Sequence, residues 1–171
     1  MEQIVTPPVA AGIPQPRSFS YAGFWKRFCA WIIDHVLLGV VEFIIFIPFI
    51  GMMGISALNF NFDEYNEPPI EFLMAIVGAC AAAIVASFLT GWLYYAIMES
   101  KKGATLGKMA LGISVTDMNG NPISFGRASG RYFGKIVSNL TLGIGFIIAG
   151  FTQQKQALHD ILAGCLVVNK Q

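Results

Sequence analysis

Two long apolar segments dominate the hydropathy pattern of the chain. Residues 28–50 would extend about 35 Å as an α-helix, which exceeds the roughly 30 Å hydrocarbon core of a bilayer. Residues 72–98 are longer and contain no charged side chain. The pattern therefore predicts two transmembrane helices, the first ending at Pro48 and Gly51 because both residues disfavour a helix interior.

Small residues recur at helical spacing in the second segment. They form two rows: Gly78, Ala82 and Ala86 on one, and Ala79, Ala83, Ser87 and Gly91 on the next. Small residues let membrane helices approach closely, so these rows are a candidate interface with a second copy or another membrane protein. The aromatic residues that follow, Trp92, Tyr94 and Tyr95, are typical of a membrane–water interface.

Charges flanking the two segments predict their orientation. The connecting residues 51–71 hold four acids and no Lys or Arg, whereas basic residues precede the first segment and follow the second. Cytoplasmic loops are enriched in Lys and Arg. We therefore expect the N-terminus and the region after Met98 to be cytoplasmic and the acidic loop to face outward.

The last third of the chain has no long apolar segment and shows shorter patterns instead. Residues 111–125 alternate small polar and β-branched residues around Asn119-Gly120, which predicts a β-hairpin. Residues 126–152 predict a helical hairpin on the cytoplasmic side that turns near 139–145, since the apolar residues 136–151 reach only about 24 Å as a helix. A straight third span with the C-terminus outside is the alternative. Residues 153–169 hold a polar motif and a strand, "CLVV", that could join the β-hairpin.

Composition agrees with a membrane domain. Hydrophobic residues make up 55% and charged residues 12% of the chain, and the mean hydropathy is +0.62. We expect an all-α membrane protein with a small β insertion: a flexible Pro-rich cytoplasmic tail, 1–20, and a membrane domain, 21–171. The net charge of +1 argues against nucleic acid. The three cysteines form no zinc or disulfide pattern, and no cofactor is indicated.

Charged residues inside the first segment are the main candidates for function. A carboxylate such as Asp34 near mid-membrane costs about 2.5–3.5 kcal/mol even on lenient scales. Arg27 lies seven residues earlier on nearly the same helix face, about 10 Å away. Asp34 therefore needs a second partner, and the candidates are Arg127, Arg131, Lys135 and Lys108. The carboxylate could handle a proton or cation, or form a fixed ion pair that docks the hairpin.

The remaining candidates have simpler interpretations. Glu42 lies nearer the outer end of the first segment and could be solvated there, and His35 is more typical of a packed, hydrogen-bonded histidine than of a metal ligand. "GATLGKM" fails as a phosphate loop because its glycines are too close and no Ser or Thr follows the lysine, so we interpret Lys108 as interfacial.

A polar patch is predicted near the C-terminus, in "QKQALHDILAG". On a helix, Lys155 would lie beside His159 and Gln156 beside Asp160, because each pair is four residues apart. We expect His159 to cap or hydrogen-bond the β-hairpin. No nucleophile–base pair is recognisable, so an enzyme is not expected.

Three separated motifs resemble the RDD family of small membrane proteins: "RFCAWIIDHVLL", "TLGKMALGISVTDMNGNPISFGRASGR" and "KQALHDILAGCLVV". The resemblance covers about residues 22–169 and places the family's signature residues at Arg27, Asp34 and Asp160. Cys165 stands where members commonly have Thr, and Gln154 where many have a basic residue. The resemblance implies a suspected role in transport, including cation/proton exchange.

Two functions follow from these predictions. The first is a transport component that acts as an oligomer, with Asp34 as the proton or cation site. The second is a structural or adaptor protein in which Arg27, Asp34 and Asp160 form a fixed lock. Either would act in the lipid bilayer, and we expect the bacterial cytoplasmic membrane with the N-terminus inside.

Overall fold

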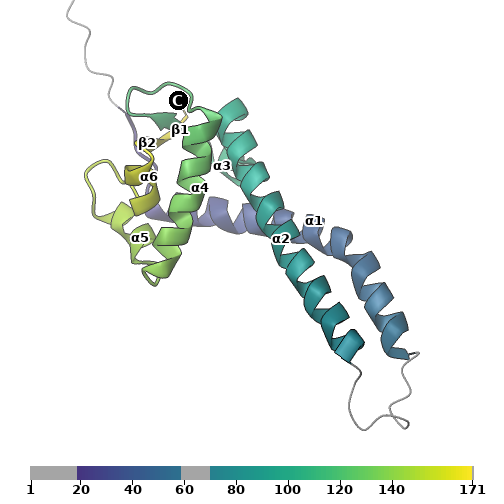
Figure 1. The fold of residues 1–171 in the computed structure, drawn as a ribbon. Coiled ribbons are helices and arrows are strands. Elements are labelled where there is room, and N and C mark those ends of the chain that lie inside the picture. The colour runs from purple at the N-terminus through teal and green to yellow at the C-terminus, as the bar shows by residue number, and fades with distance from the viewer. Residues whose placement is uncertain (1–18, 59–69, 171) are drawn as a thin grey trace, which may run out of the picture.

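Two long helices form one arm of the molecule in the computed structural model, which describes residues 19–58 and 70–170. They are α1, Phe24–Leu58, and α2, Ile70–Lys102 (Figure 1). Both are long and apolar enough to cross a membrane. The predicted tail, 1–20, and the loop proper lie largely outside the described residues.

Helix α1 continues through Pro48 and Gly51, so the predicted end of the first segment at these residues is wrong. Apolar residues continue on both sides of Pro48. In a lipid environment a helix satisfies its backbone polar groups internally, which favours continuing the helix over exposing the chain. Residues 51–58, predicted to be loop, are therefore helical.

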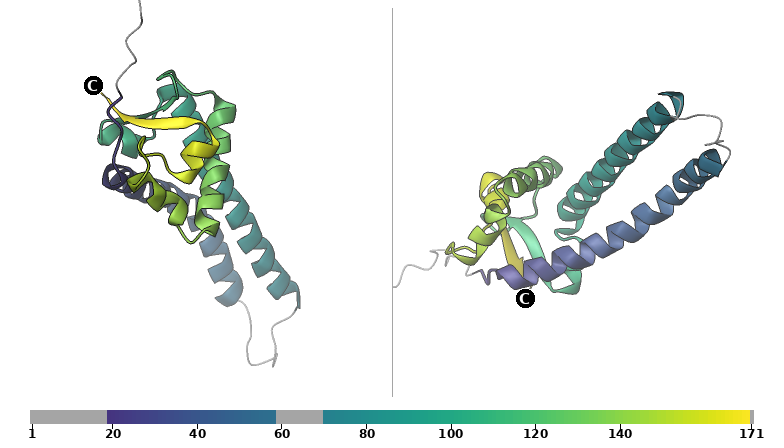
Figure 2. Two further views of the ribbon diagram at one scale, coloured as in Figure 1. Left: turned by 90° about the vertical axis from the view of Figure 1, so that its left-hand side faces the viewer. Right: turned by 90° about the horizontal axis from the view of Figure 1, so that it is seen from below.

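The other described elements gather at one end of the α1–α2 pair, as both views in Figure 2 show. They are α3 (Leu106–Ala110), β1 (Ile113–Asp117), α4 (Phe125–Leu140), α5 (Ile144–Ile147), the 3₁₀ helix η1 (Ile148–Gly150), α6 (Leu158–Leu162) and β2 (Cys165–Asn169). We call this end the sheet end. It holds the buried apolar core, in which Ile113, Val115 and Val167 are almost fully buried.

The sheet is a single antiparallel pair, in which Val115 of β1 lies opposite Val167 of β2. The expectation that the C-terminal strand joins the region of the Asn-Gly turn is confirmed. The hairpin predicted over 111–125 is wrong in its second strand, because residues 121–124 are not a strand. The Asp117 carboxylate accepts hydrogen bonds from the Asn119 and Asn121 amides, and Pro122 has no N–H for a ladder.

Helices α4 and α5 are bent by 118° relative to each other, so they do not form one straight helix. The break falls at residues 141–143, inside the predicted turn at 139–145, and Gly143 has a φ of +82° that favours glycine. Counted by length and apolarity, the described residues contain two candidate spans, or three if this bent pair is one span.

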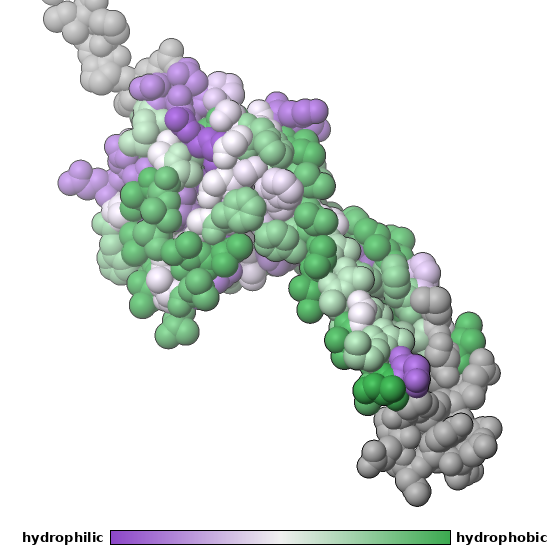
Figure 3. All heavy atoms as spheres, viewed as in Figure 1, coloured by the Kyte–Doolittle hydropathy of each residue, from purple (hydrophilic) through white to green (hydrophobic). Residues whose placement is uncertain are grey.

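Surface hydropathy differs between the arm and the sheet end (Figure 3). Hydrophobic residues cover most of the visible face of α1 and α2, whereas the sheet end has hydrophilic residues at its top and a hydrophobic area over α5. Large apolar side chains stand well exposed along both helices, for example Val36 at 61% and Ile84 at 70%. Exposed apolar surface of this extent is typical of contact with lipid.

Candidate functional site

Asp160 and Arg131 form the centre of a buried ion-pair network at the sheet end. Asp160, on α6, is fully buried and accepts a hydrogen bond from Arg131 Nε of α4 at 2.7 Å. It also pairs with Arg27 Nη1 of α1 and accepts a bond from the Ala157 amide at 3.1 Å. The structure thus brings Arg27 and Asp160 together, although they are 133 residues apart in the chain.

Glu99 is a second buried carboxylate that sequence reasoning missed. It lies on α2, pairs with Lys108 of α3, and accepts a bond from Arg131 Nη1 at 3.0 Å. Glu99 stands one residue beyond the predicted span, 72–98, and the sequence pattern assigned it no role. Helical spacing could have found it, because it shares the buried face of α2 with Tyr95 and Ala96.

Lys108 is buried, so its interpretation as an interfacial lysine is wrong. Helix α3 packs against α1, which carries Lys108 into the interior beside Glu99. Burial lowers the pKa of Lys108, and the neighbouring Arg131 lowers it further, whereas Glu99 opposes both effects. The ion pair with Glu99 therefore keeps this lysine in a buried place.

Asp34 has neutral partners in the described structure. Its carboxylate accepts hydrogen bonds from Tyr94 Oη at 2.7 Å, Thr105 Oγ1 at 2.5 Å and the Gly107 amide at 2.7 Å. The prediction that it needs Arg127, Arg131, Lys135 or Lys108 is thus wrong, and it does not join Arg27 and Asp160. Gly107 has no side chain, so the α3 backbone can approach α1 closely enough to donate this bond.

Three other predicted residues lie outside the network. His35 is exposed and its ring lies against Trp31 at a tilt of 43°, with the Trp31 carbonyl oxygen 2.9 Å from its Nδ1. Arg127 is exposed at 4.0 Å from Asp117. Glu42 is partly buried and has no ion pair or hydrogen bond within the described part of the chain.

The aromatic residues at the end of α2 make internal contacts, so their interpretation as a membrane-interface belt is incomplete. Trp92 Nε1 donates to Ser129 Oγ at 3.1 Å, and Tyr94 binds Asp34. Tyr95 is buried under the Lys135 ammonium, which lies 3.6 Å from the ring centroid. These side chains hold α4 and α1 against α2.

The two-row polar patch predicted for residues 155–160 is absent. Helix α6 begins at Leu158, and Lys155 has a φ of +49°, which excludes one continuous helix. Gln156 instead donates from Nε2 to the Cys165 carbonyl at 2.9 Å. His159 contacts Ser138 of α4, with 3.4 Å between Nδ1 and Oγ.

The buried position of His159 predicts a pH-dependent stability. Burial lowers its pKa to about 3, against an ordinary 6.5. The folded state therefore keeps the ring neutral. The stability that the buried neutral ring gives to the fold is fully present above pH 6.5 and is lost as the pH falls towards 3. Between pH 7 and pH 5 the free energy of unfolding should fall by about 2 kcal/mol.

Unfolding of the parent and His159→Gln in mixed micelles at several pH values would check this prediction. The variant should show a flatter dependence over this interval, and His35→Gln, which alters an exposed histidine, should follow the parent. An equally steep dependence in His159→Gln would contradict the assignment.

A groove of about 690 Å³ runs beside this network, between α1 on one side and α2, α4 and α5 on the other. Charged side chains that line it are Arg27, Asp34, Glu42, Lys108, Arg131 and Lys135. Glu42 lies 15 residues after Arg27 on α1, so the groove follows that helix for about 22 Å. Its apolar lining includes Phe28, Trp31 and Ile147.

The chain belongs to the RDD family of proteins: the family's sequence pattern matches residues 21–164. The matched region contains Arg27, Asp34 and Asp160, together with Glu99, Lys108 and Arg131. With its two long apolar helices, the protein is an RDD membrane protein.

Two relatives come from Bacillus subtilis (strain 168). The chain is 36% identical to the uncharacterized protein YxaI over 152 residues, which cover 87% of this chain and 97% of YxaI. It is 25% identical to the uncharacterized membrane protein YteJ over 160 residues, or 89% of this chain and 83% of YteJ. No solved structure matches the chain.

Proposed function

We propose that this RDD protein is a component of small-solute or cation/proton transport, with the groove as its solute site and Asp34 as its proton-exchanging carboxylate. The observation that carries the proposal is a groove lined by ionisable side chains next to two helices of membrane-spanning length. Ionisable groups in such helices are costly and commonly mark solute or proton pathways.

Among the three fully buried carboxylates of the described chain, Asp34 is the best suited to exchange a proton. Protonating Asp160 would leave Arg27 and Arg131 without their shared partner, and protonating Glu99 would do the same to Lys108. Asp34 binds two hydroxyls, which can rotate to accept as well as donate. Its charge can therefore change without stranding a buried cation.

The proposed transport unit is an oligomer, because two long helices are too few to enclose a pathway. Part of the predicted small-residue surface is already used within the chain: Gly91 packs against Tyr132 of α4, and Ala79 and Ala83 line a small cavity with residues of α1. Gly78 and Ala82 stay exposed and are available to another copy.

Proton flux in proteoliposomes tests the proposal. With a pH-sensitive dye inside and an imposed Na⁺ or K⁺ gradient, the parent should move protons, and Asp34→Asn should reduce the rate at least about tenfold. The matched control is Glu71→Gln, which makes the same acid-to-amide change at an exposed position near the start of α2. Equal flux from Asp34→Asn and the parent, or none from the parent, would refute transport by this site.

A structural or adaptor role is the second candidate, and the ion-pair network favours it. The contacts of Asp160 and Glu99 join α1, α2, α3, α4 and α6, an arrangement that could serve as a fixed lock. Under this alternative, Asp34→Asn would lower the unfolding temperature in detergent and the cellular level, and the parent proteoliposomes would carry no flux above empty vesicles.

A further inference from the structure

Lys135 is a partly buried lysine that lines the groove and has no carboxylate as an ion-pair partner among the described residues. Its ammonium lies over the Tyr95 ring at 3.6 Å and further from the Tyr132 ring at 6.0 Å, and it forms no ion pair within the described residues. A cation–π contact is weaker than a hydrogen-bonded ion pair in a desolvated place. The ammonium thus keeps donors available to a ligand in the groove.

Arg27 also lines the groove and has one guanidinium nitrogen without a partner among the described residues. Its Nη1 binds Asp160 and its Nε donates to the Ala22 carbonyl at 3.1 Å, but Nη2 is buried and has no hydrogen-bond partner among residues 19–58 and 70–170. Buried polar atoms are nearly always satisfied, so an unsatisfied guanidinium nitrogen needs an acceptor that the described part of the chain does not provide.

Around Arg27, Arg131 and Lys135, positive side chains outnumber negative ones. Asp160 and Glu99 are shared among three cations, Arg27, Arg131 and Lys108. Lys135 lies one helical turn from Arg131, about 6 Å away between Cβ atoms, and adds a further cation. Even with Asp34 counted, cations exceed carboxylates there, and burying an uncompensated charge is costly.

The walls of the groove are suited to an apolar tail as well as a charged head. Four of its apolar lining residues are 40–51% exposed: Phe28, Trp31, Ile136 and Ile147. A small hydrated anion would gain nothing from these side chains, whereas an acyl chain would bury them. The combination of free cationic donors and apolar walls describes an amphiphile with a negative head.

We infer that the groove binds an anionic phospholipid, whose phosphate accepts hydrogen bonds from Lys135 and Arg27 Nη2 and whose acyl chain lies along α1. The inference rests on the proposed function only in taking the groove as the binding site. Asp34 and Glu42 both line the groove from α1. Repulsion by Glu42 favours a phosphate position near Arg27 and away from Glu42, because like charges repel.

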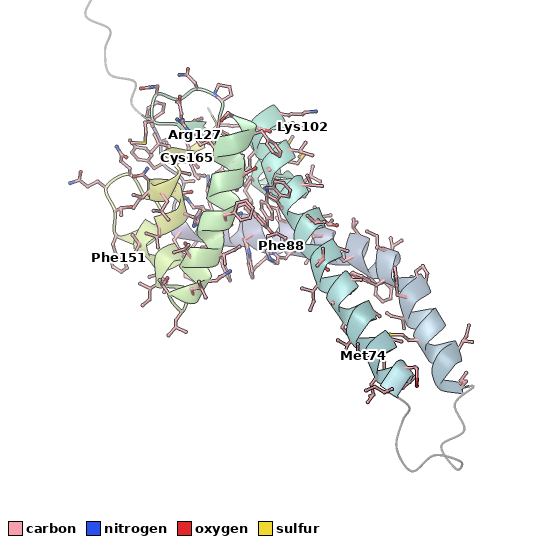
Figure 4. The ribbon with its side chains drawn as sticks, in the orientation of Figure 1. Met74, Phe88, Lys102, Arg127, Phe151 and Cys165 are labelled. Atoms are coloured by element: carbon pink, nitrogen blue, oxygen red, sulfur yellow. The ribbon has the colours of Figure 1, made fainter. Side chains whose placement is uncertain are left out.

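Native mass spectrometry of the full chain, equilibrated in mixed micelles with equal phosphatidylglycerol and phosphatidylcholine, tests the inference. The parent should retain phosphatidylglycerol about tenfold more than phosphatidylcholine, and Lys135→Gln should lose most of this preference. Lys135→Arg keeps the charge and should retain it. Lys102→Gln is the matched control, since Lys102 is exposed at the end of α2, points outward there (Figure 4) and does not line the groove.

Equal retention of the two lipids by the parent would overturn the inference, whether or not any variant folds. An unchanged preference in folded Lys135→Gln, or displacement of phosphatidylglycerol by inorganic phosphate, would also overturn it, the latter by assigning the groove to a free anion. Binding is measured without flux. Loss of lipid preference with flux intact would therefore refute the inference alone, and a Lys135-dependent preference without flux in the parent would refute the transport proposal alone.

Discussion

Asp160→Asn should be among the most destabilising single substitutions in the chain, lowering the free energy of unfolding by about 3–5 kcal/mol. The carboxylate is fully buried and binds Arg27, Arg131 and the Ala157 amide. Burial alone would raise the pKa of Asp160, but Arg131 and the other nearby positive groups hold it well below its usual range. The asparagine would leave the Arg27 guanidinium without its charged partner and would leave Arg131 paired with Glu99 alone.

Unfolding by sodium dodecyl sulfate in mixed micelles, followed by circular dichroism, would measure this loss. Glu71→Gln is the control, because it removes a carboxylate that is exposed. Arg27→Gln should cost less in the Asp160→Asn background than in the parent, since it then removes a stranded cation. Additive effects of the two substitutions would contradict the direct pairing.

Gly107→Ala should destabilise the protein by about 3 kcal/mol, through one added methyl group. A Cβ at this position would overlap the Ala30 carbonyl oxygen of α1 and lie 3.0 Å from the Asp34 carboxyl carbon. The first neighbour is backbone and cannot rotate away. Helix α3 would have to withdraw from α1, which would weaken the bonds that Asp34 accepts from Thr105 and the Gly107 amide.

Gly130→Ala provides the matched control for this prediction. Gly130 lies within α4, and a Cβ there would meet no atom within 4 Å. Alanine is the better helix former by about 0.5–1 kcal/mol, so this variant should unfold at or above the parent's midpoint in the same assay. If Gly107→Ala also unfolds at the parent's midpoint, the close approach of α3 to α1 is not required.

The two long helices and the break near residue 142 could be predicted because they depend on local patterns. Apolar length predicts α1 and α2, and the short apolar stretch with several glycines predicts the α4–α5 bend. The Asn-Gly turn was also recognisable. The strand "CLVV" was expected to join this region, and β2 does so. What was not foreseen is that β2 replaces residues 121–124 as the partner of β1, because pairing depends on which strands the fold brings together.

The charged site was predictable only in part. Asp34 stood out because a charge inside an apolar segment is costly, and the resemblance to the RDD family added Arg27 and Asp160. All three carry buried or partly buried side chains. Their partners were not foreseen. Asp34 binds hydroxyls and an amide, whereas Glu99, which sequence reasoning passed over, binds Lys108 and Arg131.

The sequence by itself determined that the chain lies in a membrane, where its long helices run and which residues are expensive to surround with lipid. These properties depend on the hydropathy of consecutive residues, so they can be predicted without knowing which residues meet in the folded protein. Only the tertiary structure decided which charges meet, because Arg27 and Asp160 are brought together by the packing of α1, α4 and α6. It also decided which cations stay free: pairing depends on a few ångströms between side chains, and hydropathy and spacing do not encode that distance.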